Sequence, residues 1–194
     1  MALTLTTKLE AINTIIACVG ESPVNSLDAS LSADAAVALN TLNEVLREVQ
    51  SRGWHFNTEL KPLVRNSEGR LPLASNVVRI DTDVSDHPDL DISIRGGFAY
   101  NRGKSTDMFD SDIKDAQVVL LLDFEEIPES ARRYVMIRAG RIFADRMVGS
   151  EKHNAYNMRD EMMAWADMRA YETDTADYTI FDHYDVARTL DRIR

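Results

Sequence analysis

The spacing of apolar residues changes twice along this chain, and that change constrains the fold more than any other feature of the sequence. Up to residue 53, and again from about residue 128, apolar side chains recur every three or four positions, the period of an amphipathic helix. Between these regions the period falls to two, and Pro and Gly interrupt it, which is typical of short antiparallel strands. We therefore predict an α+β fold: a four-helix bundle-like domain with a small, mainly antiparallel β insertion between helices two and three.

Four segments fit the helical pattern, and their ends carry helix boundary signals. The segments are 4–20, 32–52, 128–149 and 150–173. Ser32 is a suitable N-cap for the second helix, and Gly53 suits a left-handed C-cap. Pro128 suits the first position of the third helix. The domain organisation that follows is a helical domain of residues 1–53 and 126–175, a β insertion of residues 54–125 and an extended C-terminal tail of residues 176–194.

The stretch "QSRGWHFNTE" at 50–59 is the corner at which the chain leaves the second helix. Gly53 turns the chain, so that Trp54 and Phe56 pack against the helix end and anchor the β unit to the bundle. Because the insertion begins near Gly53 and ends near Pro128, the two positions must lie close together. We expect Gly53, Trp54, Phe56 and Pro128 to form a structural junction between the two parts.

Two stretches of the insertion carry a specific strand prediction. "IRGGFAYNRG" at 94–103 is typical of a hairpin whose two-residue loop is Gly96-Gly97. "VVLLL" at 118–122 is apolar on both faces, which suits a covered central strand.

Composition excludes several classes of protein. The formal net charge is −10 and the pI is about 4.8, so tight binding to nucleic acid phosphates is not expected. Cys18 is the single cysteine, which rules out an internal disulfide and suits a small buried hydrophobe. The N-terminus has no basic region followed by an apolar core, so no signal peptide is expected. No apolar run approaches the roughly 18 residues of a membrane span.

No motif indicates catalysis, and we expect no enzyme activity, metal or cofactor. The chain has no Gly-rich phosphate loop, no Cys or His pair at zinc spacing and no nucleophile elbow. Its histidines are scattered, and His55 suits a structural role. Asp123, Glu125 and Glu126 include a possible pair of glycosidase carboxylates. The alternative, which we favour, is that these acids complement the dipole of the third helix.

Two clusters of side chains on the later helices are interpreted as packing or contact surfaces. The third helix carries five arginines: Arg132, Arg133, Arg138, Arg141 and Arg146. We interpret Arg133, Arg138 and Arg141 as a subunit interface, while pairing within the chain remains an equal alternative, with partners such as Asp145, Glu161 and Asp167. The fourth helix carries a methionine cluster that we expect in the core: Met158, Met162, Met163 and Met168.

Four segments together resemble the family of tail tubular protein A, the head-to-tail adaptor of short-tailed phages. They are "AINTIIACVGESPVNSL" at 11–27, "SRGWHFN" at 51–57, "RGGFAYNR" at 95–102 with "FD" at 109–110, and "DFEEIPESARRYVMIRAGRIFADRMVGS" at 123–150. No single motif is chemically diagnostic, but their order and spacing match the family over essentially the whole chain.

The resemblance implies a structural role in the virion, in a protein made in the host cytoplasm. Such adaptors form a ring of twelve copies between the capsid portal and the tail nozzle, tail tubular protein B, with tail fibres attached nearby. DNA passes through the channel without specific binding, which agrees with the acidic composition. We expect Tyr178, Phe181 and Tyr184 of the tail to dock on the portal. Some relatives have been suggested to degrade polysaccharide, so a glycoside hydrolase is the alternative function.

Overall fold

The helices and strands follow the predicted order of two helices, a β insertion and two helices. The structure, a computed structural model, describes residues 4–28, 31–83, 87–149 and 151–176. The elements are α1 (Lys8–Ala17), α2 (Ala33–Gln50), the 3-10 turn η1 (His55–Asn57), β1 (Thr58–Leu63), β2 (Val77–Thr82), β3 (Ile92–Arg95), β4 (Phe98–Asn101), β5 (Ile113–Leu120), α3 (Glu129–Met147) and α4 (Glu151–Thr175). This order confirms the α+β fold with a β insertion between the second and third helices.

Capping determines where the first helix begins. The hydroxyl of Thr7 accepts a hydrogen bond from the Glu10 backbone N–H at 3.3 Å, and the Glu10 carboxylate accepts one from the Thr7 N–H at 2.8 Å. This reciprocal capping box makes the helix begin at Lys8 rather than at residue 4. Leu5 falls within the helix predicted over 4–20, but it lies before the observed helix and is 57% exposed. The predicted start of this helix was therefore too early.

The boundaries of α2 and α3 largely follow the predicted signals. Ser32 caps α2 by accepting the N–H of Ala35, and Gly53 adopts a φ of +76° just beyond the helix. Pro128 lies one position earlier than predicted, at the N-cap of α3, because its extended ψ of 152° places it outside the first turn.

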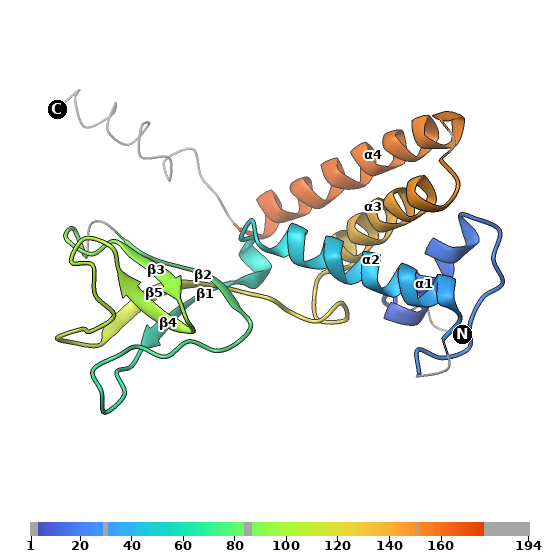
Figure 1. The fold of residues 1–194 in the computed structure, drawn as a ribbon. Coiled ribbons are helices and arrows are strands. Elements are labelled where there is room, and N and C mark those ends of the chain that lie inside the picture. Colours follow the sequence, from blue (N-terminus) through green and yellow to red (C-terminus); the bar gives the residue numbers. More distant parts are fainter. Residues whose placement is uncertain (1–3, 29–30, 84–86, 150, 177–194) are drawn as a thin grey trace, which may run out of the picture.

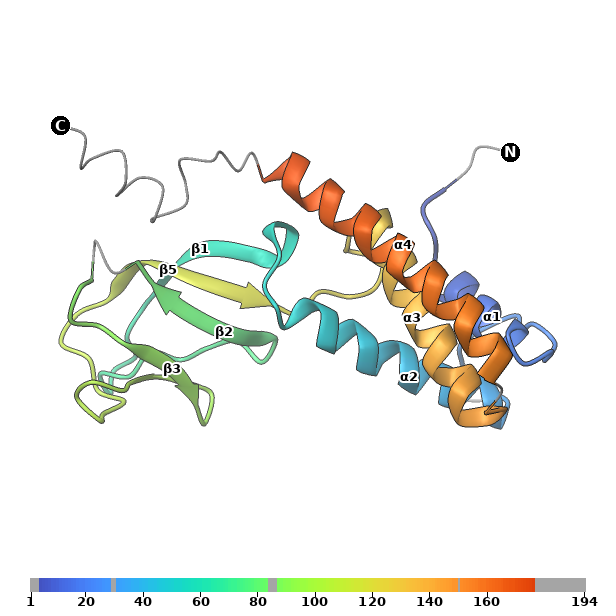
Figure 2. The ribbon, with the colours of Figure 1, turned by 90° about the horizontal axis from the view of Figure 1, so that it is seen from above.

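Two separate apolar cores lie at the two ends of an elongated molecule (Figures 1 and 2). The bundle core is formed by all four helices, with α3 packed against each of the other three, and its largest fully buried side chains include Phe143, Phe124 and Ile12. The β core is built from the strands, with Leu71 and Ala99 fully buried. Leu122, between β5 and α3, packs against both cores.

The β part consists of a three-stranded antiparallel sheet, ordered β1-β5-β2, and the β3-β4 hairpin. Arg95 pairs with Phe98 across Gly96-Gly97, which confirms the hairpin and its two-residue loop. The central strand is β5, which contains the predicted apolar run up to Leu120. Sequence reasoning did not identify β1, because "TELKPL" contains a proline and exposes four successive side chains.

The methionine cluster of α4 is only partly in the core. Met168 is buried, as predicted, but Met158, Met162 and Met163 are 52%, 70% and 58% exposed. The prediction of burial was wrong for these three. A neighbouring face of α4 packs against the core instead, and its residues are Ala164, Trp165, Met168 and Glu172. The sequence pattern was ambiguous there, since apolar residues are available on more than one face of the helix.

Replacing Gly53 by Val should destabilise the protein. A Cβ at this position would lie 3.1 Å from Cγ2 of Val119 and would overlap the guanidinium of Arg79, in a backbone conformation that disfavours side chains. We expect a loss of about 1–3 kcal/mol in the free energy of unfolding, measured by urea denaturation.

Gly20→Val is the matched control for that change. Gly20 has a similar φ of +82°, but a Cβ there would meet no atom within 4 Å. The control should therefore show the backbone strain without the steric overlap. An unchanged stability in the Gly53 variant would contradict the structural role of this corner.

Candidate functional site at the bundle–β junction

A buried side-chain amide joins the two parts of the molecule, because it pairs with a backbone N–H and a backbone carbonyl as a neighbouring strand would. Gln50, the last residue of α2, is fully buried. Its side chain donates to the carbonyl of Leu122 at 2.9 Å and accepts the Leu122 N–H at 2.8 Å. Both backbone polar groups of Leu122, a half-buried residue of the returning linker, are thereby paired with a buried side chain. The junction thus ties the end of α2 to the chain that leaves β5.

A second buried amide completes this link. Asn57 is fully buried, and its side-chain N–H groups donate to the carbonyls of Gln50 and Leu120 at 2.9 and 2.7 Å. Its side-chain oxygen accepts the backbone N–H of Trp54 at 2.8 Å. One side chain therefore bonds to α2, to β5 and to the corner between them. Sequence reasoning missed Gln50 and Asn57, since an isolated amide gives no periodic signal.

The predicted aromatic corner packs on the bundle. The indole N–H of Trp54 donates to the carbonyl of Val49 at 2.7 Å, and its ring lies edge-on to Trp165 of α4, with ring centres 5.3 Å apart. Tyr134 of α3 contacts the same Trp165 at 5.0 Å, and Phe56 packs against the bundle core. Trp54 and Phe56 thus each contribute an aromatic contact between the insertion and the helices, and Tyr134 extends the aromatic cluster within the bundle.

A buried carboxylate on α4 caps the 3-10 turn. Glu172 is 7% exposed and accepts the backbone N–H groups of His55 at 2.8 Å and Phe56 at 3.4 Å. Two donors aligned at the start of a helical turn stabilise a negative charge. The last turn of α4 is thereby attached to the corner. Glu172 lies at helical spacing from Trp165 and Met168. This spacing is the sequence signal from which its burial could have been predicted.

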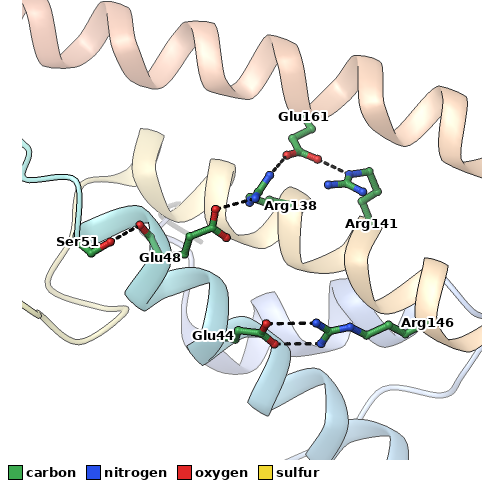
Figure 3. A network of polar contacts seen from close by, with 7 residues as sticks. All are labelled: Glu44, Glu48, Ser51, Arg138, Arg141, Arg146 and Glu161. Atoms are coloured by element: carbon green, nitrogen blue, oxygen red, sulfur yellow. Dashed lines mark hydrogen bonds and ion pairs between the residues drawn. The ribbon is translucent and has the colours of Figure 1, made fainter.

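An arginine network fastens α3 to α2 and α4 (Figure 3). Arg138 bonds to Glu48 of α2 at 2.8 Å and to Glu161 of α4 at 2.5 Å. Arg141 donates to the other oxygen of Glu161 and to Asp145. Arg146 forms a two-pronged pair with Glu44 of α2; the two distances are 3.0 and 3.2 Å. Arg138 and Arg141 are thus paired within the chain, which is the alternative that the sequence left open.

The network fixes the charge state of its central acid. Burial would raise the pKa of Glu161, but the hydrogen bonds from Arg141 and Arg138 outweigh it and lower that pKa below its usual value. Burial lowers the pKa of Arg138, but its hydrogen bonds to Glu161 and Glu48 outweigh this effect and raise that pKa. The pKa of Arg141 is raised mainly by its hydrogen bond to Glu161. All three groups therefore stay charged at neutral pH.

The other predicted contact residues fall in different environments. The side chain of Arg133 is exposed and makes no hydrogen bond or ion pair with any residue that the structure describes. Its assignment to a subunit interface stays a prediction, as it does for Arg138 and Arg141. Tyr178, Phe181 and Tyr184 lie outside the described residues.

The acidic loop before α3 holds the N-terminal segment. Arg132 is 5% exposed and donates to the carbonyls of Ile127 at 2.9 Å, Thr6 at 2.7 Å and Glu125. The carboxylate of Glu125 accepts the N–H of Lys8 at 3.2 Å. The adjacent carboxylate of Glu126 accepts the N–H of Asp123 at 2.9 Å, which places both glutamates in structural contacts.

Within the described residues, no group of three or more His, Cys, Asp or Glu side chains is arranged to hold a metal ion. Over the same part of the chain, no helix combines the length and the apolar character needed to cross a bilayer.

Replacing Gln50 by Leu should weaken the junction. The change keeps a similar volume but leaves the N–H and the carbonyl of Leu122 without a buried partner. We expect a loss of about 2–4 kcal/mol in unfolding free energy, measured in urea. Asn76→Ala is the control, because Asn76 donates to the neighbouring carbonyl of Leu121 at an exposed position. Equal effects of the two substitutions would argue against a special role for the buried amide.

Replacing Glu161 by Gln should destabilise the bundle in a pH-dependent way. We expect a loss of about 1–3 kcal/mol at pH 7, and a smaller loss for Glu44→Gln in the exposed Arg146 pair. Because the pKa of Glu161 is lowered by folding, its contribution is present above 4.5 and is lost as the pH falls through the lower folded-state pKa. Urea denaturation at pH 7 and near pH 3 should show that the difference in unfolding free energy between the unsubstituted protein and the Glu161→Gln variant becomes smaller at the lower pH. A difference that stays constant would contradict this.

Comparison with known proteins places this architecture in one family. The family model described as "Tube: Tail tubular protein" matches residues 9–178. The chain is similar to tail tubular protein A of Klebsiella phage KP34, with 30% identity over 128 residues. That alignment covers 66% of this chain and 66% of the relative, so the chain spans about two thirds of the length of the curated relative that it matches. Residues 9–178, which the family model matches, include the junction, the arginine network and the β insertion. The chain belongs to the tail tubular protein family, whose members are structural components of phage tails.

Proposed function

We propose that this chain is a ring-forming adaptor that joins the capsid portal to the tail nozzle and forms part of the DNA ejection channel. The observation that carries the proposal is the family match, which extends from residue 9 to residue 178. A twelve-membered ring, a nozzle partner of the tail tubular protein B type and tail fibres nearby are the finer parts of the same proposal.

The architecture suits a component that must withstand mechanical force. Buried amides connect the two cores, and ion pairs fasten three of the four helices, so that the parts resist separation. A formal net charge of −10 disfavours tight contact with phosphates, which suits a channel through which DNA must pass freely. Arg133, exposed on α3, is the member of the predicted interface that remains available to an acid on a neighbouring copy.

The geometry gives no support to polysaccharide degradation. Glu125 and Glu126, the candidate pair of carboxylates, each accept a backbone N–H and hold local structure. We therefore propose a structural component without catalytic activity.

Imaging of the purified chain, alone and mixed with its cognate portal, tests the proposal. We expect a ring that stacks coaxially on the portal, with a particle mass that gives the number of copies. This result is expected even if the chain alone is monomeric, because partner contacts can drive assembly. A chain that ignores the portal at every concentration would overturn the proposal.

The contribution of the tail is tested in the same assay. A chain ending at residue 176 keeps all of α4 but lacks Tyr178, Phe181 and Tyr184. If the tail docks on the portal, this shortened chain should lose stacking while retaining its fold by circular dichroism. Undiminished stacking would reject the tail as the docking segment and leave the adaptor proposal standing.

A further inference from the structure

A groove between α3, α4 and the end of α2 is open in the described part of the chain. Its volume is about 340 Å³, within the range of about 300–1,000 Å³ that holds small organic groups. Aromatic and sulfur-containing side chains line it together with charged ones: Tyr134, Met158, Met162, Trp165, Arg52, Arg141 and Glu161. A hollow that combines aromatic and methionine side chains with arginines in this way is a candidate contact site.

The wall of the groove on α4 is an exposed stripe that leads to the end of the helix. Met158 and Met162 are 52% and 70% exposed, and Ala166, Arg169 and Thr173 follow at spacings of three and four. Methionine is flexible and polarisable, so such a stripe adapts well to aromatic partners. The stripe continues directly toward Ala176, where the described chain ends.

Two cations at or near the groove are not neutralised by the described residues: Arg52 lines the groove, and Arg169 lies farther along the exposed stripe of α4. Arg52 stacks on Trp165, with its guanidinium carbon 5.0 Å from the ring centre. Neither Arg52 nor Arg169 forms an ion pair with a carboxylate among the described residues. Arg138 and Arg141, by contrast, form ion pairs with Glu48, Glu161 and Asp145. The site therefore favours an occupant with both aromatic and acidic side chains.

The segment directly after α4 has that composition. Residues 177–185 read "DYTIFDHYD" and contain no Lys or Arg. Three aromatic side chains alternate with acids in the order Asp177, Tyr178, Phe181, Asp182, Tyr184 and Asp185. Its apolar and negative groups are complementary to the methionine stripe and to the two unpaired arginines.

The segment is also long enough to reach the groove. Met162 lies about 21 Å from Ala176 along the helix axis, at a rise of about 1.5 Å per residue. Nine extended residues span about 30 Å. A short tether holds the segment near the groove at an effective concentration in the millimolar range, well above that of a separate copy in dilute solution.

We propose that residues 177–185 occupy this groove of their own chain in the free protein. Phe181 and Tyr184, which lie far enough along the segment, pack against Trp165, Met162 and Met158, and the aspartates face Arg52 and Arg169. The proposal concerns the free chain and stands whether or not the same segment later docks on a portal.

Photocrosslinking of the full-length chain tests this assignment. Benzoylphenylalanine in place of Tyr184, which eight extended residues carry about 27 Å from Ala176, should form crosslinks within one chain to residues 158–165, identified by mass spectrometry. A mixture of isotopically heavy and light chains separates crosslinks within a chain from those between copies. Crosslinks that join heavy to light chains would assign the groove to a second copy and overturn the proposal, as would the absence of any crosslink to residues 158–165.

A pair of substitutions on the same helix provides the matched control. Met162→Glu places a charge in the groove, whereas Met163→Glu places it on another face at a position that is 58% exposed. The groove variant should lower the crosslink yield by about tenfold or more, because the carboxylate would be buried among apolar groups. The Met163 variant should leave the yield unchanged, and circular dichroism should show both variants folded. Equal yields in both variants would contradict occupation of the groove.

Discussion

The paired hydrogen bonds between Gln50 and Leu122 are the interaction on which the arrangement of this molecule depends. The chain crosses from the bundle to the β part and back, and each crossing brings backbone polar groups into an apolar junction. An unpaired group there costs about 1–3 kcal/mol, so the crossings are stable only where side chains supply partners. Gln50 supplies them for the returning strand, while Leu122 seals the same point by packing against both cores.

Other side chains of the junction reinforce the link between the bundle and the β part. Asn57 connects α2 to β5, Trp54 stacks on Trp165, and Glu172 brings the last turn of α4 to the corner. The arginine network acts at a distance from the junction but has a related effect, because it fixes how α4 lies against α2 and α3. In a ring adaptor of the proposed kind, force applied to one end of the chain would pass through these contacts to the other.

The parts of this structure that could be predicted from the sequence are those that repeat along the chain or depend on backbone conformation. Helical periodicity identified four helices, and Gly96-Gly97 identified the hairpin because few residues adopt its left-handed turn. The Gly53 corner was predictable for the same reason. Periodicity could not choose between adjacent faces of α4, where Met158, Met162 and Met163 turned out to be exposed. It also gave no sign of Gln50 or Asn57, whose roles depend on partners about 60 to 70 residues away.

If the two cores form one mechanical unit, the junction should open only when the whole molecule unfolds. Native-state hydrogen exchange at the Leu122 amide measures this most directly, because that N–H is held by the Gln50 side chain. The account predicts an opening free energy for Leu122 equal to that of Val45, which is buried in the middle of α2. A markedly lower value for Leu122, with Val45 still fully protected, would show that the two parts separate while each stays folded, and would contradict the account.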